Sequence, residues 1–341
     1  MRVPLTVAAL LAGASLLSAF APQSNPYLGR WNITGVAPDT TYVYWLEVAQ
    51  DGDKLKGLFL NRGGHAVPLA VVKVENGELV FQGFAGGRAT PPGPGGPEYR
   101  AKVEGGKLVG HHSLPVNTGG RGRNADPNAP PPPPPTTRVV NWVGVRPPTW
   151  PASNANGNHT YGKPVVLFDG SSLDAWSYIP ASANPWSIED GTMTNAYPKT
   201  PAANIVSKEK FGDFKIEAEY KLEKDSNSGI YLRGRYELQV LDDFTQNAPE
   251  PFLGHMAIYG RTAPSVKASK PAGEWQSMSA VLVGNRVTVT LNGQRLHDNV
   301  AIIGITGGAL DADELSPGPI LIQGDHSKVW FRKVVVTPIT K

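Results

Sequence analysis

Two stretches of strict two-residue alternation constrain the fold of this chain more than any other feature. KFGDFKIEAEYKL (210–222) and NSGIYLRGRYELQVLD (227–242) both place apolar residues at every second position, with polar residues between them. The second stretch has one exception, Gly234, on its apolar side. Because successive side chains of a β-strand point to opposite faces, each stretch predicts a strand with one core face and one polar face.

The rest of the chain repeats this pattern in shorter form. Turn signals such as DGD, ENGE, EGGK and LNGQ separate short apolar runs, and no segment shows the helical period. Glycine (38) and proline (32) are frequent, which favours many short strands over long helices. We therefore predict an all-β protein: a C-terminal antiparallel β-sandwich preceded by a small antiparallel β-barrel or sandwich.

Charge and cysteine content exclude several classes of function. The net charge is +3 and no Lys/Arg run occurs, so we expect no nucleic-acid partner. The chain has no cysteine, which excludes disulfides, thiol catalysis and thiolate metal sites.

The sequence divides into four parts. They are a signal peptide (1–21), a small all-β domain of unknown role (27–148), a linker rich in Pro, Ser, Asn and Gly (149–163), and a β-sandwich (164–339). A basic start, an apolar run and Ala-Phe-Ala at 19–21 predict export to the periplasm or medium, with no membrane span in the mature protein. Pro22 disfavours cleavage, so an uncleaved anchor is the alternative. Two proline-rich insertions, 90–97 and 130–135, interrupt the first domain and are expected as loops.

The first domain offers few polar features. His111 and His112 are adjacent on a predicted strand, so they point to opposite faces and are poorly placed to bind one metal together. We interpret them and His65 as ordinary surface histidines. Substrate capture and a lid over the second domain both stay open as roles for this domain.

The polar face of 227–242 is unusual for a surface strand. Its odd positions carry Tyr231, Arg233, Glu237 and Gln239, where Lys and Thr are the common choice. An aromatic ring for stacking beside bidentate donors and acceptors suits a sugar, whose hydroxyls lie next to an apolar C–H face. Glu219 of the preceding strand is expected to converge on the same face. Plain solvent exposure is the alternative.

Several short motifs of the chain occur in a defined order. FDGSSLDAW, WSIEDG, FGDFKIEAEY, NSGIYLRGRYELQVLDD, AIYG, KPAGEWQ, LNGQ, GPILIQGDH and FRKVVV occur in the order found in the 3-keto-disaccharide hydrolase family, which this chain resembles over about residues 164–339. The resemblance implies a concanavalin-like β-sandwich (jelly roll) of the lectin and glucanase type. It also implies a glycosidase-type hydrolase or lyase that cleaves 3-keto-glycosides.

That chemistry needs few groups. A carbonyl at C3 acidifies the hydrogen on C2, so a base can remove it, the aglycone leaves from C1, and water adds later. The expected acid/base candidates are Glu219, Glu237, Asp242 and His326. The expected substrate-binding residues are Tyr231, Arg233 and Gln239 of the polar face, Tyr259 of AIYG, and Gln323 of QGDH.

Two other readings stay open. Direct hydrolysis would use two carboxylates that flank the glycosidic bond, and a lectin-like protein would bind carbohydrate without cleaving it. The acidic loop LDADELSPG (310–318) has the composition of a Ca²⁺ site, but no metal-binding spacing supports it. We therefore predict no cofactor and assign no metal ligand.

Overall fold

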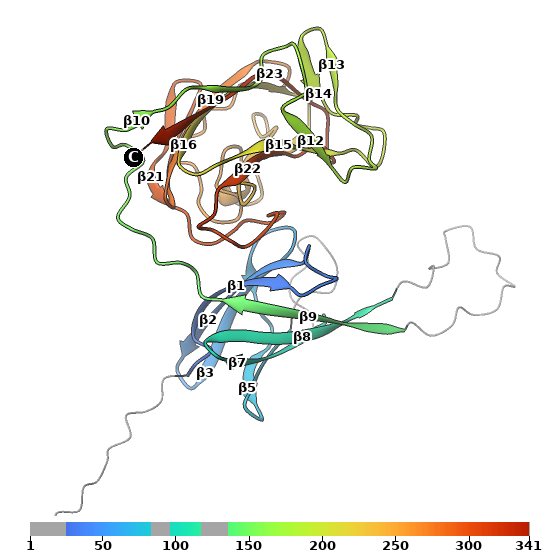
Figure 1. Ribbon diagram of the computed structural model, residues 1–341, viewed down its shortest axis with the longest axis vertical. Coiled ribbons are helices and arrows are strands. Elements are labelled where there is room, and N and C mark those ends of the chain that lie inside the picture. The colour runs from blue at the N-terminus through green and yellow to red at the C-terminus, as the bar shows by residue number, and fades with distance from the viewer. Residues whose placement is uncertain (1–24, 83–95, 117–135, 341) are drawn as a thin grey trace, which may run out of the picture.

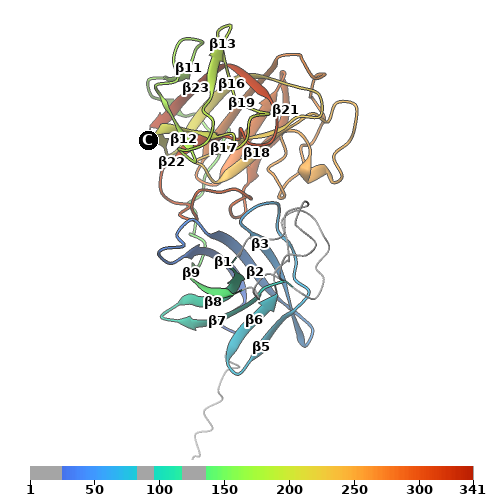
Figure 2. The ribbon, with the colours of Figure 1, turned by 90° about the vertical axis from the view of Figure 1, so that its right-hand side faces the viewer.

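The computed structural model describes residues 25–82, 96–116 and 136–340, and these form two β bodies joined end to end (Figures 1 and 2). The predicted signal peptide, the 130–135 insertion and most of the 90–97 insertion lie outside the described residues. The prediction of an all-β fold is confirmed. Within the described ranges the only helical element is one 3-10 turn, η1 (Pro251–Leu253), and no helix there is long and apolar enough to cross a membrane.

The first body is a single antiparallel sheet with strand order β4-β3-β2-β1-β9-β8-β7-β6-β5. Its strands are β1 (Gly29–Gly35), β2 (Val43–Asp51), β3 (Lys54–Asn61), β4 (Val67–Pro68), β5 (Val72–Glu75), β6 (Glu78–Gln82), β7 (Glu98–Glu104), β8 (Lys107–Pro115) and β9 (Thr137–Val145). The sheet curls until β3 contacts β5, so it approaches a closed barrel. Two short strands form its edges: β4 pairs with β3, and β5 pairs with β6.

Aromatic side chains fill the inside of this curled sheet. Trp31, Tyr44 and Phe59 are almost fully buried and pack with Tyr99. The surface prediction for His112 is wrong: it is 1% exposed and stacks on the Tyr99 ring at 4.3 Å between centroids. Alternation still holds, since its neighbour on β8 is exposed.

The second body is a β-sandwich of two antiparallel sheets. The larger sheet runs β13-β14-β23-β16-β19-β20-β21, with β10 and β11 also paired to β23, and the smaller runs β12-β15-β22-β17-β18. Its strands are β10 (Thr160–Tyr161), β11 (Val165–Phe168), β12 (Trp176–Ile179), β13 (Ser187–Glu189), β14 (Thr192–Thr194), β15 (Asn204–Phe211), β16 (Phe214–Leu222), β17 (Asn227–Leu232), β18 (Tyr236–Leu241), β19 (Gln276–Val283), β20 (Arg286–Leu291), β21 (Gln294–Ala301), β22 (Gly318–Ile322) and β23 (Val329–Thr340).

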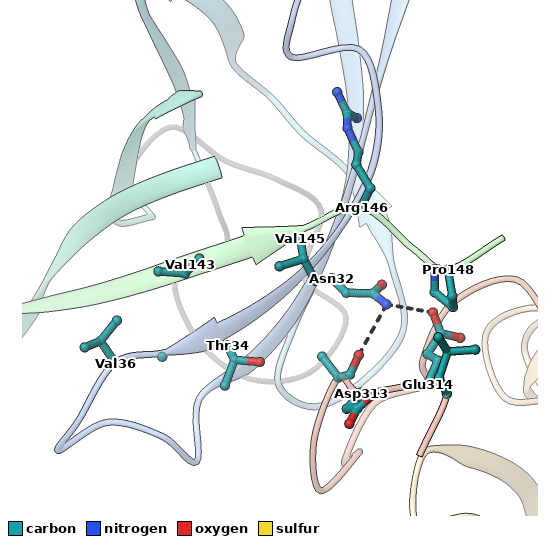
Figure 3. A pocket seen from close by; sticks show the side chains of 12 residues that line it. Asn32, Thr34, Val36, Val143, Val145, Arg146, Pro148, Asp313 and Glu314 are labelled. Carbon is teal, nitrogen blue, oxygen red and sulfur yellow. Dashed lines mark hydrogen bonds between the residues drawn. The ribbon is translucent and has the colours of Figure 1, made fainter. Parts of the chain in front are cut away.

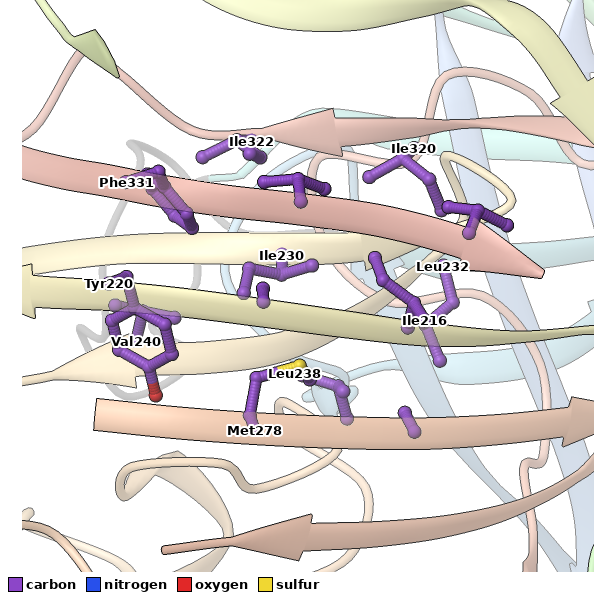
Figure 4. Close-up of a cluster of buried hydrophobic side chains, with 14 of the residues drawn as sticks. Ile216, Tyr220, Ile230, Leu232, Leu238, Val240, Met278, Ile320, Ile322 and Phe331 are labelled. Atoms are coloured by element: carbon purple, nitrogen blue, oxygen red, sulfur yellow. The ribbon is translucent and has the colours of Figure 1, made fainter. Parts of the chain in front are cut away.

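The core of the sandwich lies between these two sheets (Figure 4). Ile216 and Tyr220 of the larger sheet face Ile230 and Leu238 of the smaller one, and all four are at most 1% exposed. These are the apolar positions of the two alternating stretches. The polar positions of both stretches therefore lie on the outer faces of the sandwich, one stretch on each sheet.

The predicted linker 149–163 is packed rather than free. The Ala155 amide donates to Asn299 Oδ1 at 2.9 Å, and Asn156 Oδ1 accepts the Thr288 hydroxyl at 2.7 Å. Trp150 lies 5.8 Å from the Arg233 guanidinium. The segment thus follows the surface of the sandwich before β10 joins β23. A domain boundary within it stays a prediction that limited proteolysis would test.

Candidate active site

The stretch 227–242 forms a hairpin, not the single strand that its alternation suggests. Strands β17 and β18 pair Tyr231 with Glu237 and Gly229 with Gln239, and residues 233–235 form the turn. A three-residue turn preserves the odd–even pattern, so Tyr231, Glu237 and Gln239 still share one face. That face is the outer side of the smaller sheet.

A cavity of about 270 Å³ lies on this face. Six of the nine site residues expected from the sequence line it: Tyr231, Glu237, Gln239, Tyr259, Gln323 and His326. Asn204, Asn227 and Asp325, which the sequence did not single out, line it too. Asn227 opens the NSG motif and Asp325 belongs to QGDH, so the motifs contained the signal, but only the fold brings these residues together.

Among the acids of the cavity, Glu237 has the largest pKa shift. It is 4% exposed, and burial raises its carboxyl pKa to about 8, because an ionised carboxylate loses its water there. The negative charge of Asp325 raises the pKa of Glu237 further. A group with this pKa is mostly protonated at neutral pH and can donate a proton.

The carboxyl of Glu237 lies directly over Gly229 of the partner strand. A Cβ atom at residue 229 would come 2.3 Å from Glu237 Oε1, which no real contact allows. Glycine is therefore required at this position to leave room for the acid.

Gly229→Ala should accordingly displace the Glu237 carboxyl and lower turnover by about 10²-fold, the typical cost of misplacing a reacting group by 1 Å. Gly212→Ala is the matched control, since a Cβ there meets no atom within 4 Å. Steady-state rates and circular dichroism of both variants check this. Unchanged turnover in folded Gly229→Ala would contradict it.

His326 is held by its neighbour in the chain. Its Nδ1 lies 2.6 Å from Asp325 Oδ1, and an ionised carboxylate only accepts, so Nδ1 carries the proton. In the neutral imidazole Nε2 is then the acceptor, and it has no partner within the described residues. The pair is thus arranged as a base held in one tautomer.

The remaining lining combines amides with an apolar patch. Asn227 Oδ1 is buried and has no hydrogen-bond partner among the described residues. Leu321 and the Tyr231 ring pack together and supply the apolar part of the lining. Such a surface has hydrogen-bonding groups for sugar hydroxyls and an apolar area for the C–H face.

Three expected site residues lie elsewhere. Glu219 is on β16 of the larger sheet, across the core from the cavity, where its Oε2 accepts from Arg332 at 2.5 Å. Asp242 Oδ2 accepts the Asp225 amide at 2.9 Å. The expected convergence of Glu219 with Arg233 and Glu237 is wrong, because alternation predicts a face of a strand but not the sheet that the strand joins.

Arg233 belongs to the hairpin turn and points away from the cavity. Its guanidinium donates to the Gly212 and Gly284 carbonyls, both at 2.8 Å, and to Asp213 Oδ1 at 2.8 Å. It is 3% exposed and has a φ of 54°. These contacts tie the turn of the hairpin to the β15–β16 connection and to the turn between β19 and β20.

Arg233→Ala should therefore lower the free energy of unfolding by about 2–4 kcal/mol, since it removes the donor of two carbonyls and the ion-pair partner of Asp213, whose Oδ1 keeps the Gly284 amide. Substrate affinity of the folded variant should stay unchanged. Arg332→Ala, which removes an exposed cation, is the control. Denaturant titration and KM measure the two effects, and a raised KM with normal stability would restore Arg233 to the site.

The acidic loop 310–318 uses its carboxylates within the protein. Asp311 accepts from Arg235 at 2.5 Å, Asp313 accepts the Ser316 hydroxyl at 2.5 Å, and Glu314 accepts the Tyr236 hydroxyl at 2.9 Å. Among the residues that the structure describes, no three His, Asp or Glu side chains are grouped to hold one ion.

Comparison with known proteins gives one consistent family. Residues 163–337 match the family model of the 3-keto-alpha-glucoside-1,2-lyase-like domain. A 3-keto-disaccharide hydrolase of Bacteroides thetaiotaomicron is 25% identical over 145 residues, which cover 33% of this chain and 49% of that protein, so the chain spans about half the length of this relative.

Solved structures are similar over about half of the chain. A protein of Parabacteroides distasonis named as a glycosyl hydrolase is 28% identical, with 56% of this chain and 91% of that chain covered and a TM-score of 0.45. A second from the same organism is 23% identical, with 52% and 100% covered and a TM-score of 0.42.

Proposed function

Since its residues 163–337 make this chain a member of the 3-keto-alpha-glucoside-1,2-lyase-like family, we propose that it cleaves the glycosidic bond of sugars oxidised at C3. The observation that carries the proposal is that one cavity contains both a candidate acid and a candidate base. The pKa of about 8 supports Glu237 as the acid, and the hydrogen bond between His326 and Asp325 supports His326 as the base. Acid and base at the same ligand are what a 1,2-elimination needs.

The first half of the proposed reaction is the elimination. His326 Nε2 takes the proton from C2, and the C–H electron pair forms an enolate with the C3 carbonyl. The enolate collapses to a C1–C2 double bond, the C1–O bond breaks, and Glu237 gives its proton to the leaving oxygen. Amide N–H groups of Asn227, Gln239 or Gln323 are suited to stabilise the enolate oxygen.

The second half returns both groups to their starting states. The Glu237 carboxylate accepts a proton from water as the water oxygen adds to C1. The protonated His326 gives a proton back to C2, and the C3 ketone is restored. One water is consumed in total, so an elimination mechanism gives the products of hydrolysis.

Substrate discrimination tests the function. We expect turnover of 3-keto-trehalose and none of trehalose, because only the ketone acidifies the C2 hydrogen. Equal turnover of both sugars would reject the proposal. Tight binding of the keto sugar without turnover would instead favour a lectin-like protein.

Isotope labelling tests the mechanism. Reaction in D₂O under single-turnover conditions should place deuterium at C2 of the released 3-keto-sugar, since the returned proton exchanges with solvent. Incorporation has to exceed that of an enzyme-free control, in which the ketone exchanges spontaneously. Product without C2 deuterium would point to direct hydrolysis, for which Glu237 and Asp325 are the carboxyl groups of the cavity.

We also propose that the protein is exported and that its mature form begins near Pro22 to Tyr27. The basic start and apolar run of residues 1–21 support this. N-terminal sequencing of protein from the periplasm or medium tests it, and intact Met1 protein confined to the cytosol would contradict it.

A further inference from the structure

The cavity is not built by the family domain alone. Gly63 and Gly64, in the loop between β3 and β4 of the first body, line it together with the residues of the smaller sheet. The family match begins only at residue 163. Part of the wall around Glu237 therefore comes from the N-terminal domain.

The loop 61–65 approaches the sandwich backbone to backbone. The Gly308 amide donates to the Arg62 carbonyl, 2.6 Å from nitrogen to oxygen. A Cβ on Gly307 would lie 2.0 Å from the Gly64 carbonyl oxygen. The Gly307 carbonyl in turn accepts the Tyr231 hydroxyl at 2.9 Å, so one short path connects the loop to a residue of the cavity.

His65 makes a second contact at the end of this loop. A Cβ on Gly260 would come 2.3 Å from the His65 Cβ, so glycine is needed there for the loop to fit. The His65 ring meets the edge of Tyr259, another residue of the cavity, at 6.5 Å between centroids, and that of Phe252 at 5.7 Å. The interpretation of His65 as an ordinary surface residue is thus wrong.

Contacts around the loop fix the two bodies against each other. Trp45 of β2 packs under the Arg261 guanidinium at 4.1 Å and belongs to one buried cluster with Leu60 and Ile305. Figure 3 shows the Asn32 amide donating to the loop before β22, to Glu314 Oε1 at 2.7 Å. The other oxygen of Glu314 holds Tyr236, the residue before Glu237. The loop 61–65 therefore has a fixed position over the cavity.

We propose that the loop 61–65 is a wall of the active site that contacts the bound glycoside and determines which glycosides fit. This inference rests on the proposed function. Because Gly63 and Gly64 have no side chains, the loop exposes only backbone atoms to the cavity. A larger residue at either position would occupy space that a ligand can use. The N-terminal domain then acts as a specificity element for the chemistry of the second domain.

The absence of cysteine allows a direct test. Gly63→Cys introduces the only thiol of the chain, at a position where a Cβ meets no atom within 4 Å and φ is not positive. Ser277→Cys, on the exposed outer face of β19, is the matched control. Each variant is treated with a small methanethiosulfonate or a bulky maleimide, with and without 3-keto-trehalose.

We expect the bulky label at position 63 to lower kcat/KM by roughly tenfold or more, the small label to lower it less, and ligand to slow the labelling. The labelled control should keep full activity. If bulky labelling at position 63 left kcat/KM unchanged and ligand did not slow the labelling, the proposal that loop 61–65 is a wall of the site would be wrong. The proposed function would not be affected. If the wild-type protein turned over no 3-keto-glycoside, both the proposed function and the proposed role of the loop would be rejected.

Discussion

Glu237→Gln is expected to lower kcat by roughly 10²–10⁴-fold, the usual contribution of a positioned acid, while KM changes little. The amide has the size of the carboxyl and fits over Gly229, but it has no proton to give to the leaving oxygen. Glu219→Gln, on the far sheet, is the matched control and should keep full activity. Steady-state kinetics with a 3-keto-glycoside measure both variants.

Substrates with different leaving groups distinguish the proposed acid role of Glu237 from the proposed base role of His326. An aryl 3-keto-glycoside whose phenol is acidic leaves without protonation, so Glu237→Gln should lose little rate on it. His326→Ala should be slow on alkyl and aryl substrates alike, because C2 proton removal is needed for both. If Glu237→Gln were equally impaired on both substrates, the acid role would pass to another group. Full activity on both would remove Glu237 from the reaction.

The protonation state of Glu237 also shapes the pH profile of the unmodified protein. Its pKa of about 8 means that the acid form dominates below pH 8 and is lost above it. The rate should therefore fall as the pH rises through 8, and the fall should be absent with the aryl substrate.

Two-residue alternation carried much of what the sequence predicted. It assigned Ile230, Leu238 and their neighbours to the core and Tyr231, Glu237 and Gln239 to a common outer face, and the structure has this arrangement. The rule works because the side chains of paired strands keep their faces through a turn of odd length.

The same rule could not place Glu219, Arg233 or the N-terminal loop. The alternation of β16 is as regular as that of the stretch 227–242, but β16 joins the opposite sheet, so Glu219 faces away from Glu237. Arg233 falls in the turn, where alternation no longer sets direction. Gly63 and Gly64 reach the cavity only through the docking of two bodies, which depends on contacts such as Trp45 with Ile305 that no local pattern encodes.

Replacing Glu237 should also stabilise the protein at alkaline pH. The carboxyl has a pKa of about 8 in the folded protein and 4.5 as its ordinary value. Between these pH values the folded state holds a proton that the unfolded state has lost, so rising pH favours unfolding by up to about 1.4 kcal/mol per pH unit. Below pH 4.5 both states are protonated, and above pH 8 neither is.

Glu237→Gln has no such titration, so the difference in unfolding free energy between variant and wild type should depend on pH. It should be small near pH 4.5, grow towards pH 8 to a few kcal/mol, with an upper limit of about 5 kcal/mol, and then level off. Denaturant titrations from pH 4.5 to 9 measure it, with Glu219→Gln as a control whose difference should not grow comparably. A constant difference for Glu237→Gln would mean that the folded protein does not hold the proton, and the acid of the proposed elimination would then be missing. If the difference in unfolding free energy grows with pH and kcat also falls, both effects arise from the same buried carboxyl. Its burial then costs stability and makes it a proton donor at neutral pH.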